Sequence, residues 1–313
     1  MDHQDFIAMI KLRDLQYLVA VDQYRHFGKA AQACAVSQPT LSGQILKLEN
    51  QLGIQLIERH NRKVMATSAD RVLIDKARAI MHNVQDFECS AKALLDPFNT
   101  EVHLGLIPTL APYLLPHIMG ALNEQLPEAK FFLHEDKTQS LIEKLKSGEL
   151  DCLILPHMAD DDQLEYYHLF YEELELAMSQ RHPLAARNDI QLDDIRDETI
   201  LTLEDGHCLQ QHTMDYCFFA KQNQDQRFKA TSLETLRYMV ASDMGLTLIP
   251  KLAILGREDQ GVHYHTFKEN PPKRQVVLAM RSEFHNQSLI RKMVSTIRQA
   301  TDVLMPEDTA AIA

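Results

Sequence analysis

The chain has 313 residues, enough for two or three domains, and is 45% hydrophobic and 24% charged, as a globular protein with sizeable cores would be. It has no apolar run of the roughly 18 residues that cross a bilayer and no secretory pattern at its acidic N-terminus, and its five cysteines are an odd number. These features argue against a membrane protein and a secreted disulfide framework, and they favour the cytoplasm.

The net charge of −12 conceals an asymmetry. Residues 10–67 carry eight Lys and Arg against four Asp and Glu, whereas the rest carries 24 against 40. A basic N-terminal segment on an acidic body indicates that only this segment meets a polyanion. Random scatter of surface charge is the alternative.

Three helices are predicted in the basic segment. Apolar residues at helical spacing predict the first over residues 12–21, and the Ala-rich residues 27–34 predict the second. After a tight turn, Ser37 is a good N-cap and Pro39 suits the first turn of a third helix. The expected buried stripe of that third helix is Leu41, Ile45, Leu48 and Leu52.

A short helix, a tight turn and a polar-faced helix form the helix-turn-helix pattern, whose second helix places its N-terminal residues on base edges in the major groove. The basic residues 59–63 predict a hairpin, or wing, that contacts phosphates. A three-helix domain that binds no nucleic acid is the alternative. The residues expected to contact double-stranded DNA are Arg13, Ser37, Gln38, Pro39, Thr40, Ser42, Gln44, Arg59, Arg62 and Lys63.

A long helix should follow, because apolar residues alternate at spacings of four and three over three heptads. This seam is Leu73, Ala77, Ile80, Val84, Phe87, Ala91 and Leu94. Such a seam needs a partner, and we expect a second copy of the chain, so that a homodimer reads a dyad-symmetric operator. An intramolecular partner is the alternative. Pro97 is expected to end the helix.

Strands and helices alternate in the rest of the chain, which predicts an α/β fold with a largely parallel sheet. The strands are expected at residues 101–107, 130–134, 152–155, 199–203 and 276–280, and the helices at 113–125, 140–147 and 287–300.

Cys208 and Cys217 lie nine positions apart, in a segment that reads as a helix beginning after Asp205 and Gly206. A helix N-terminus and an imidazolium of His207 would both lower the pKa of the Cys208 thiol. Nine helical residues rise about 13.5 Å, but a disulfide joins Cα atoms roughly 4.4–6.8 Å apart. The pair therefore suits a switch that refolds. Two buried core thiols, or a metal site of His207, Cys208, His212 and Cys217, are the alternatives.

The N-terminal motifs, residues 30–31, 36–42, 45, 48–49, 52–53 and 56–59, resemble the DNA-binding domain of the LysR-type transcriptional regulators. This resemblance implies a winged helix-turn-helix domain at residues 10–67, a linker and dimerisation helix at 68–96, and a two-lobed α/β regulatory domain like the periplasmic binding proteins at 100–305. It also implies a homotetramer, RNA polymerase as a partner, and no cofactor.

Residues 105–109, 112–116, 203–209 and 230–237 resemble the peroxide-sensing members of this family. The resemblance implies an activator of oxidative-stress genes in which hydrogen peroxide oxidises Cys208, which then forms a disulfide with Cys217. Glutaredoxin or thioredoxin would reduce it again. It implies a peroxide pocket of Thr109, Thr138, His207, Cys208 and Arg274.

Two other functions stay open. A small organic effector between the lobes would suit Thr109 and Thr138 equally well, in a regulator without thiol chemistry. A thiol peroxidase would use the same cysteines, but an enzyme has no need of a helix-turn-helix domain, so we do not expect an enzyme.

Overall fold

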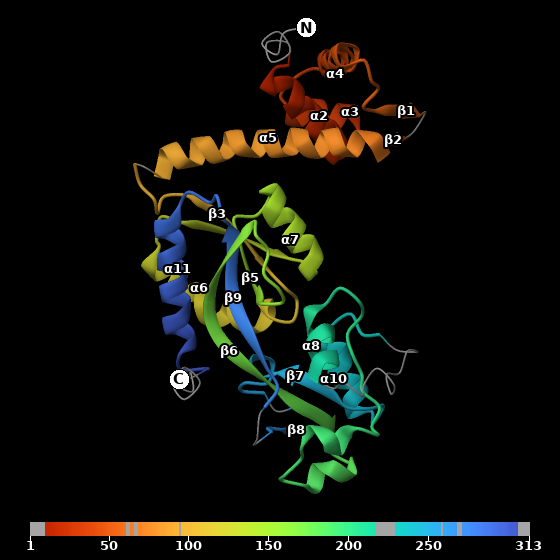
Figure 1. The fold of residues 1–313 in the computed structure, drawn as a ribbon, viewed down its shortest axis with the longest axis vertical. Coiled ribbons are helices and arrows are strands. Elements are labelled where there is room, and N and C mark those ends of the chain that lie inside the picture. The colour runs from red at the N-terminus through yellow and green to blue at the C-terminus, as the bar shows by residue number, and fades with distance from the viewer. Residues whose placement is uncertain are drawn as a thin grey trace. The chain divides into compact units, whose positions relative to one another are not determined.

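The computed structural model describes residues 10–60, 63–65, 68–93, 95–216, 229–257, 259–267 and 271–305. The chain forms two compact units, residues 1–92 and 93–313 (Figure 1). Within the described ranges, no helix combines the length and apolar character that a membrane span requires.

The first unit contains the predicted helix-turn-helix. Its helices are α2 (Leu12–Tyr24), α3 (Phe27–Ala33) and α4 (Gln38–Leu52). Ser37 caps α4 by accepting a hydrogen bond from the Thr40 amide at 3.3 Å, which confirms the predicted start of this helix. The short strands β1 (Glu58–His60) and β2 (Lys63–Met65) pair antiparallel, which confirms the hairpin expected as the wing.

A buried carboxylate fixes the chain where it leaves α4. Glu49 Oε1 accepts hydrogen bonds from the amides of Leu56 and Ile57, at 2.9 and 3.0 Å. Both amides are buried and would otherwise need another acceptor inside the core. The side chain therefore determines how the segment before the wing packs on α4.

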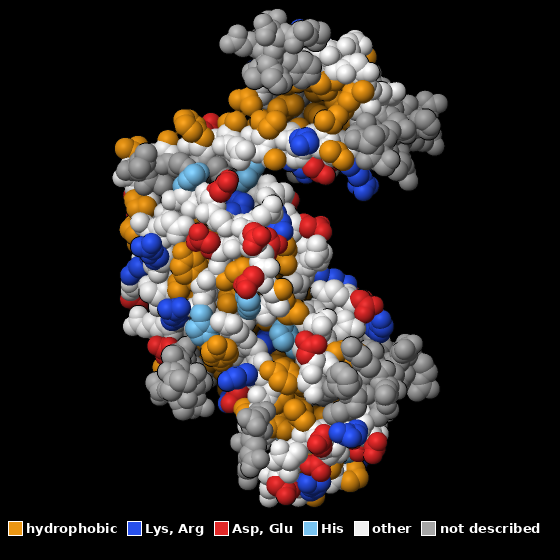
Figure 2. All heavy atoms as spheres, in the orientation of Figure 1, with side chains coloured by type: hydrophobic (Ala, Val, Ile, Leu, Met, Phe, Trp, Pro, Cys, Tyr) orange, Lys and Arg blue, Asp and Glu red, His pale blue; other side chains and the backbone are white. Residues whose placement is uncertain are grey.

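The long helix α5 (Ser68–Ala93) uses the predicted apolar seam in two ways. Near its start, the seam residue Ala77 and its neighbour Ile74 are buried in the core formed with α2 and α4, and Arg78 forms an ion pair with Asp22 of α2. Further along, Ile80 is 43% exposed and Phe87 is 75% exposed. Figure 2 shows hydrophobic side chains on the surface of this helix. The intramolecular partner that we considered as the alternative thus accounts for the first turns of the seam only.

The second unit is built on one seven-stranded sheet, whose strands lie in the order β4-β3-β5-β9-β6-β7, with β8 also paired to β6. The strands are β3 (Glu101–Leu106), β4 (Lys130–Glu135), β5 (Cys152–Pro156), β6 (Leu164–Ser179), β7 (Thr247–Pro250), β8 (Val262–His265) and β9 (Lys273–Arg281). Only β3 pairs parallel, with β4 and β5, whereas β9 and β6 pair antiparallel with their neighbours. The expectation of a largely parallel sheet is therefore wrong.

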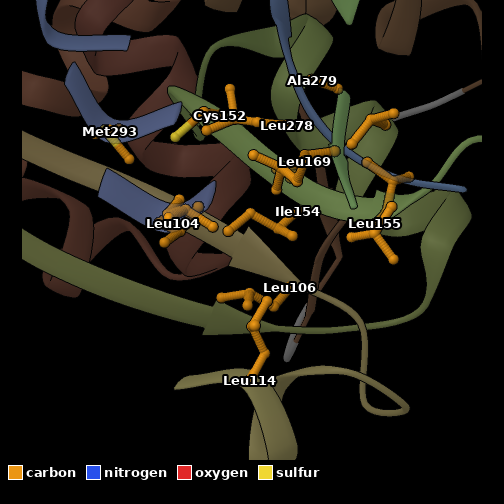
Figure 3. Packing of buried hydrophobic residues seen from close by; sticks show 14 of the residues in the cluster. Leu104, Leu106, Leu114, Cys152, Ile154, Leu155, Leu169, Leu278, Ala279 and Met293 are labelled. Atoms are coloured by element: carbon orange, nitrogen blue, oxygen red, sulfur yellow. The ribbon is translucent and has the colours of Figure 1, made fainter. Parts of the chain in front are cut away.

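Two hydrophobic cores divide this unit into two lobes. The first lobe contains α6 (Ala111–Gln125), α7 (Thr138–Ser147) and α11 (Gln287–Thr301). Figure 3 shows side chains of β3, β5, β6 and β9 packed together in its core. The second lobe contains α8 (Cys208–Tyr216), α10 (Leu233–Ala241) and the short helices η1 (Pro183–Ala186) and η2 (Leu192–Ile195). The short helix η3 (Lys251–Ala253) contributes to both cores.

The long strand β6 and its partner β9 connect the lobes, because they pair over most of their length. In β6, Leu169 and Phe170 belong to the first core, whereas Leu174 and Leu176 belong to the second. This continuous pair of strands places its middle residues at the junction of the lobes.

One predicted strand is absent from the described residues. Residues 199–203 form no named strand, because they make only two isolated parallel bridges, Ile200 with Leu246 and Leu203 with Ala230. In the turn after α10, Asp243 has a φ of 61°. Glycine adopts this left-handed conformation without strain, and aspartate tolerates it better than most residues.

Candidate functional site

Cys208 lies where the two lobes meet, as the first residue of α8. Its side chain is 6% exposed and packs in the first core, whereas the next residue, Leu209, packs in the second. Gly206, with a φ of 96°, makes the turn before it, and a Cβ there would lie 3.2 Å from Lys137 Cδ. The predicted start of this helix is confirmed, and Cys208 is a free thiol. Cys217, the proposed partner, lies outside the described residues.

Thr138 and His207 bring unsatisfied polar atoms to this site. Thr138 is the first residue of α7, but the N-cap is Lys137, so the hydroxyl does not cap the helix. Among the described residues, neither Thr138 Oγ1 nor His207 Nε2 has a nitrogen or oxygen hydrogen-bond partner, although both atoms are buried. The Thr138 hydroxyl interacts with the Cys208 thiol, and His207 Nε2 lies 3.9 Å from Glu204 Oε1. Buried polar atoms are almost always satisfied, so spare hydrogen-bonding capacity at both atoms indicates a place for a small polar ligand.

Arg274 and Thr109 form the other side of the site. Arg274 is buried in β9, so it is not the surface charge that its neighbour Lys273 is. Its Nη1 donates to Thr109 Oγ1 at 3.4 Å and its Nη2 donates to the Thr109 carbonyl at 3.2 Å. Its Nε donates to Glu172 Oε2 at 2.8 Å. Thr109 is itself buried in the loop between β3 and α6 of the first lobe. These contacts therefore join the first lobe to β9, one of the two strands that connect the lobes.

The electrostatics of Cys208 differ from the expectation. Burial raises the pKa of the thiol above its usual range, although Arg274, the Thr138 hydroxyl and the backbone amides at the start of α8 all act to lower this pKa. Burial also lowers the pKa of His207, and the Lys137 charge lowers it further. Both directions favour a neutral imidazole at His207 and a protonated thiol at Cys208, whereas the sequence analysis expects a lowered thiol pKa.

His212 lies one turn along α8. Its Nδ1 is 2.9 Å from the Cys208 carbonyl, and because a carbonyl only accepts, Nδ1 carries the proton. Burial and the nearby charge of Arg274 lower its pKa to about 4. In the described part of the chain, no three His, Cys, Asp or Glu side chains are grouped so that they could hold a metal ion.

Two further cysteines have described side chains, Cys152 and Cys34. Cys152 is buried in β5, and burial raises the pKa of its thiol strongly. Cys34 follows α3 and is half-buried against the first unit's core. The side chain of Cys89 lies outside the described residues. Cys152 and Cys34 thus pack against the hydrophobic cores of their own units.

Three cationic side chains near the junction of the lobes are each paired with a carboxylate. Arg274 is 2.7 Å from Glu172, and Lys137 Nζ is 2.5 Å from Glu204 in the loop before Cys208. The third is Arg237 of α10, which forms an ion pair with Glu234.

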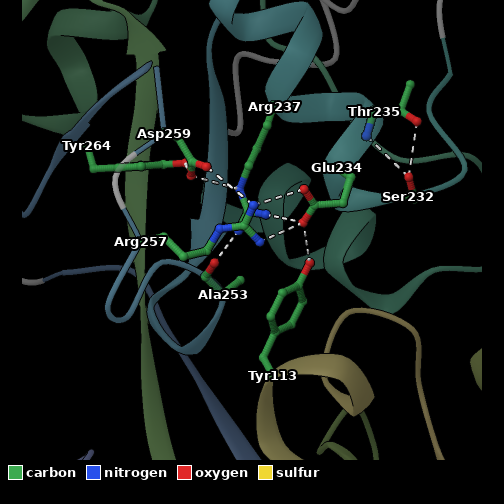
Figure 4. Close-up of polar contacts among 9 residues, drawn as sticks. All are labelled: Tyr113, Ser232, Glu234, Thr235, Arg237, Ala253, Arg257, Asp259 and Tyr264. Atoms are coloured by element: carbon green, nitrogen blue, oxygen red, sulfur yellow. Dashed lines mark hydrogen bonds and ion pairs between the residues drawn. The ribbon is translucent and has the colours of Figure 1, made fainter. Parts of the chain in front are cut away.

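Figure 4 shows that Glu234 also connects the lobes. It accepts a hydrogen bond from Tyr113 of α6 at 3.2 Å, and it binds both Nη atoms of Arg257 at 3.0 and 3.1 Å. The lobes are therefore held together by polar contacts that already satisfy the cations between them.

The expected DNA-contacting residues lie mostly at one end of α4. Ser37, Gln38, Pro39 and Thr40 are exposed, while Ser42 and Gln44 are half-buried. Arg13 is exposed on α2 and its Nε donates to Tyr17 at 2.8 Å. Arg59 and Lys63 belong to β1 and β2. Their side chains, and all of Arg62, lie outside the described residues.

The sequence analysis missed three residues of the site: Glu172, Lys137 and His212 as a neighbour of Arg274. Glu172 has Glu173 beside it and Glu175 shortly after it, so the sequence gives no sign that Glu172 is the fully buried carboxylate that requires a cation. Lys137 directly precedes Thr138, but its pairing with Glu204 depends on the docking of the lobes. No local pattern in the sequence reports such a contact.

Known proteins resemble this chain over nearly its whole length. The sequence model of one protein family, bacterial regulatory helix-turn-helix protein, lysR family, matches residues 12–70. The sequence model of a second family, LysR substrate binding domain, matches residues 96–302. The hydrogen peroxide-inducible genes activator of Pectobacterium carotovorum subsp. carotovorum is 42% identical over 291 residues, which are 93% of this chain and 96% of that protein.

The DNA-binding transcriptional dual regulator OxyR of Escherichia coli K12 is 42% identical over 294 residues, which are 94% of this chain and 96% of that protein. A solved structure of a full-length OxyR variant from Pseudomonas aeruginosa matches with a TM-score of 0.77 at 30% identity, over 92% of this chain and 95% of that one. The chain therefore belongs to the OxyR group of the LysR family of helix-turn-helix transcriptional regulators.

Proposed function

We propose that this protein is a transcriptional regulator that senses hydrogen peroxide through Cys208 and answers by forming a disulfide with Cys217. The observation that carries the proposal is the set of groups that act on one buried thiol: the Thr138 hydroxyl, the Arg274 guanidinium and the backbone amides at the start of α8. His207, which directly precedes Cys208, adds a buried Nε2 with no hydrogen-bond partner among the described residues. The names of the relatives, which refer to genes induced by hydrogen peroxide, point to the same ligand.

The chemistry follows from the pocket. Peroxide is small and both donates and accepts hydrogen bonds, as Thr109, Thr138 and His207 require. Neutral His207 takes the Cys208 proton, the sulfur attacks one peroxide oxygen, and the O–O bond breaks. The departing hydroxide takes the proton back and leaves as water, and Cys208 becomes a sulfenic acid, oxidised by two electrons. Arg274 stabilises the negative charge that develops on the sulfur.

The second step changes the fold. The Cys217 thiol attacks the sulfenic sulfur, an S–S bond forms and a second water leaves. Cys208 begins α8, and a helical path to position 217 would separate the two Cα atoms by about 13.5 Å, which is too far for a disulfide. The helix must therefore unwind, and this transition is the switch that repacks the lobes.

The domain organisation converts this switch into a change at DNA. In our proposal, residues 10–67 bind DNA through the ten residues named above, residues 68–96 dimerise, and residues 100–305 sense peroxide. A homodimer, or a homotetramer, then contacts a dyad-symmetric operator and activates transcription with RNA polymerase. Glutaredoxin or thioredoxin resets the switch by reducing the disulfide.

Peptide mapping without reductant, before and after about one equivalent of peroxide, tests the redox step. We expect a Cys208–Cys217 crosslink to appear quickly while Cys34, Cys89 and Cys152 remain free thiols. If all five thiols remain intact after the treatment, the redox proposal fails.

A Cys208→Ser variant tests the link to DNA. We expect it to retain basal operator binding, because position 208 belongs to the unit that contains residues 93–313 and not to the helix-turn-helix. Its footprint on DNA should no longer change with peroxide. A footprint that still changed would exclude Cys208 as the sensor.

The structure gives less support to the two other functions. An organic anion between the lobes would need an available cation, but Arg274, Arg237 and Lys137 are each paired with a carboxylate. A peroxidase would need fast turnover, whereas each cycle here requires α8 to unwind and refold. Near-stoichiometric consumption of peroxide is therefore expected.

A further inference from the structure

Glu172 is a completely buried carboxylate that the proposed peroxide chemistry does not use. It lies in β6 directly opposite Arg274 of β9 in the antiparallel register. Arg274 Nε and Nη2 lie 2.8 and 2.7 Å from the same carboxylate oxygen, Glu172 Oε2. A buried charge is costly without a partner, and each of these two groups provides the partner of the other.

The carboxylate is itself held in one orientation. Its second oxygen, Oε1, accepts a hydrogen bond at 3.0 Å from the amide of Leu252, in η3. Both oxygens are therefore used, one by a guanidinium and one by a backbone amide. Because contacts with β9 and η3 hold the Glu172 side chain in one orientation, this side chain can in turn hold the Arg274 guanidinium in place.

The other end of the guanidinium acts on the thiol. Arg274 contacts both the hydroxyl and the carbonyl of Thr109, and its charge acts to lower the pKa of Cys208. The contacts thus run from Leu252 through Glu172 and Arg274 to Thr109, and the charge of Arg274 acts on the sulfur. A change in charge at Glu172 must alter the field that Cys208 experiences.

We propose that Glu172 is a positioning residue for the chemistry of Cys208: it fixes the Arg274 guanidinium in the pocket and offsets its charge, so that the resting thiol stays less reactive. The inference rests on the proposed role of Cys208 as the sensor. The role of Glu172 adds to the burial that raises the pKa of the Cys208 thiol.

The variant Glu172→Gln separates charge from shape. Glutamine keeps the side-chain length and an oxygen for the Leu252 amide, but it leaves the charge of Arg274 uncompensated. We expect more Cys208 thiolate at a given pH. A thiol that titrates above the assay pH gains about tenfold in thiolate for each unit by which its pKa falls. Alkylation of Cys208 and its reaction with peroxide should accelerate by up to about tenfold at pH 7.

The experiment uses the reduced full-length protein and follows iodoacetamide alkylation of Cys208 against pH by peptide mass spectrometry. Glu175→Gln is the matched control, since Glu175 is another buried carboxylate of β6. Glu172→Gln is also compared in the background of Arg274→Gln. The proposal requires a profile shifted to lower pH for Glu172→Gln alone and no further shift once Arg274 is replaced.

An unchanged profile in Glu172→Gln, or a shift that persists without Arg274, would overturn the inference. If Glu172→Gln does not fold, Glu172→Asp provides the test, because it keeps the charge at a shorter reach and should shift the profile in the same direction by less. A folded Glu172→Asp with the wild-type profile contradicts the proposal in that case. Since alkylation uses no peroxide, the outcome is independent of whether the wild type forms the crosslink.

Discussion

Single side chains around Cys208 work against the burial that keeps its thiol protonated. Thr138 does so with a hydroxyl that has no conventional partner in the described part of the chain. Replacing Thr138 by Val removes this donor and keeps nearly the same volume. We expect the second-order rate constant of Cys208 with peroxide to fall about tenfold, which equals about 1.4 kcal/mol, a typical value for a hydrogen bond to a charged group.

Stopped-flow kinetics with peroxide would measure this rate, and urea unfolding would show whether the stability has changed. Thr296→Val is the matched control, because Thr296 is a buried threonine of α11 far along the chain from the site. Equal rates for Thr138→Val and the wild type would show that the hydroxyl takes no part in the reaction.

His212 should make the protein sensitive to acid. Its pKa is about 4 in the folded protein, against 6.5 for an ordinary histidine. As the pH falls, the unfolded chain therefore binds a proton before the folded one does, and stability is lost between about pH 6.5 and pH 4. His212→Gln removes this proton uptake while it can still donate to the Cys208 carbonyl. The free energy of unfolding should then depend less steeply on pH across this window.

Urea unfolding at several pH values between 4 and 7 checks the effect of His212. The control is His285→Gln, which replaces an exposed histidine before α11 and should leave the slope unchanged. If His212→Gln shows the full wild-type slope, acid sensitivity arises from other groups.

At the scale of elements, α8 must be stable enough to hold Cys208 but able to unwind. One tether at its end is the Tyr216 hydroxyl, which donates to the Lys273 carbonyl of β9 at 2.7 Å. Tyr216→Phe removes this exposed hydrogen bond, which is worth about 1 kcal/mol. We expect disulfide formation after the sulfenic acid to accelerate by up to about fivefold, with the rate of the first oxidation unchanged.

Quenched-flow mass mapping separates the two steps, since it resolves the sulfenic acid from the disulfide. Gln211→Ala serves as the control, because Gln211 contacts Asp215 within α8 and does not tether the helix to β9. Acceleration in both variants would mean that general loosening of the helix, and not this tether, sets the rate.

Helix ends were predictable because their signals are local. Ser37 caps α4, and Gly148, with a φ of 80°, ends α7 as the sequence indicates. Strand pairing was not predictable, since the βα alternation gives no sign that β9 returns antiparallel between β5 and β6. For the same reason the site was incomplete: Thr138 and Cys208 carry motifs, whereas the partnership of Glu172 with Arg274 exists only through the register of two distant strands.

For the whole molecule, α5 decides how a signal in one unit reaches a pair of DNA-binding helices. The start of the helix is fixed in its own unit by Ile74, Ala77 and the Arg78–Asp22 ion pair. The later part of the seam, with Ile80 and Phe87, exposes apolar side chains that a second copy would cover. The start of α5 thus packs into the first unit, and in our proposal its later part forms the dimer interface.

Phe87→Asp should break the dimer, because a carboxylate in the centre of an apolar helix seam loses its hydration without gaining a partner. We expect analytical ultracentrifugation to show at least a tenfold weaker self-association. Operator binding should weaken as well, because separate monomers bind the two half-sites independently, whereas a dimer binds them together. Val72→Asp is the control: Val72 is also exposed on α5, but it lies off the seam, so this variant should stay associated. If Phe87→Asp sediments like the wild type, α5 does not form the interface, and the exposed seam has another occupant.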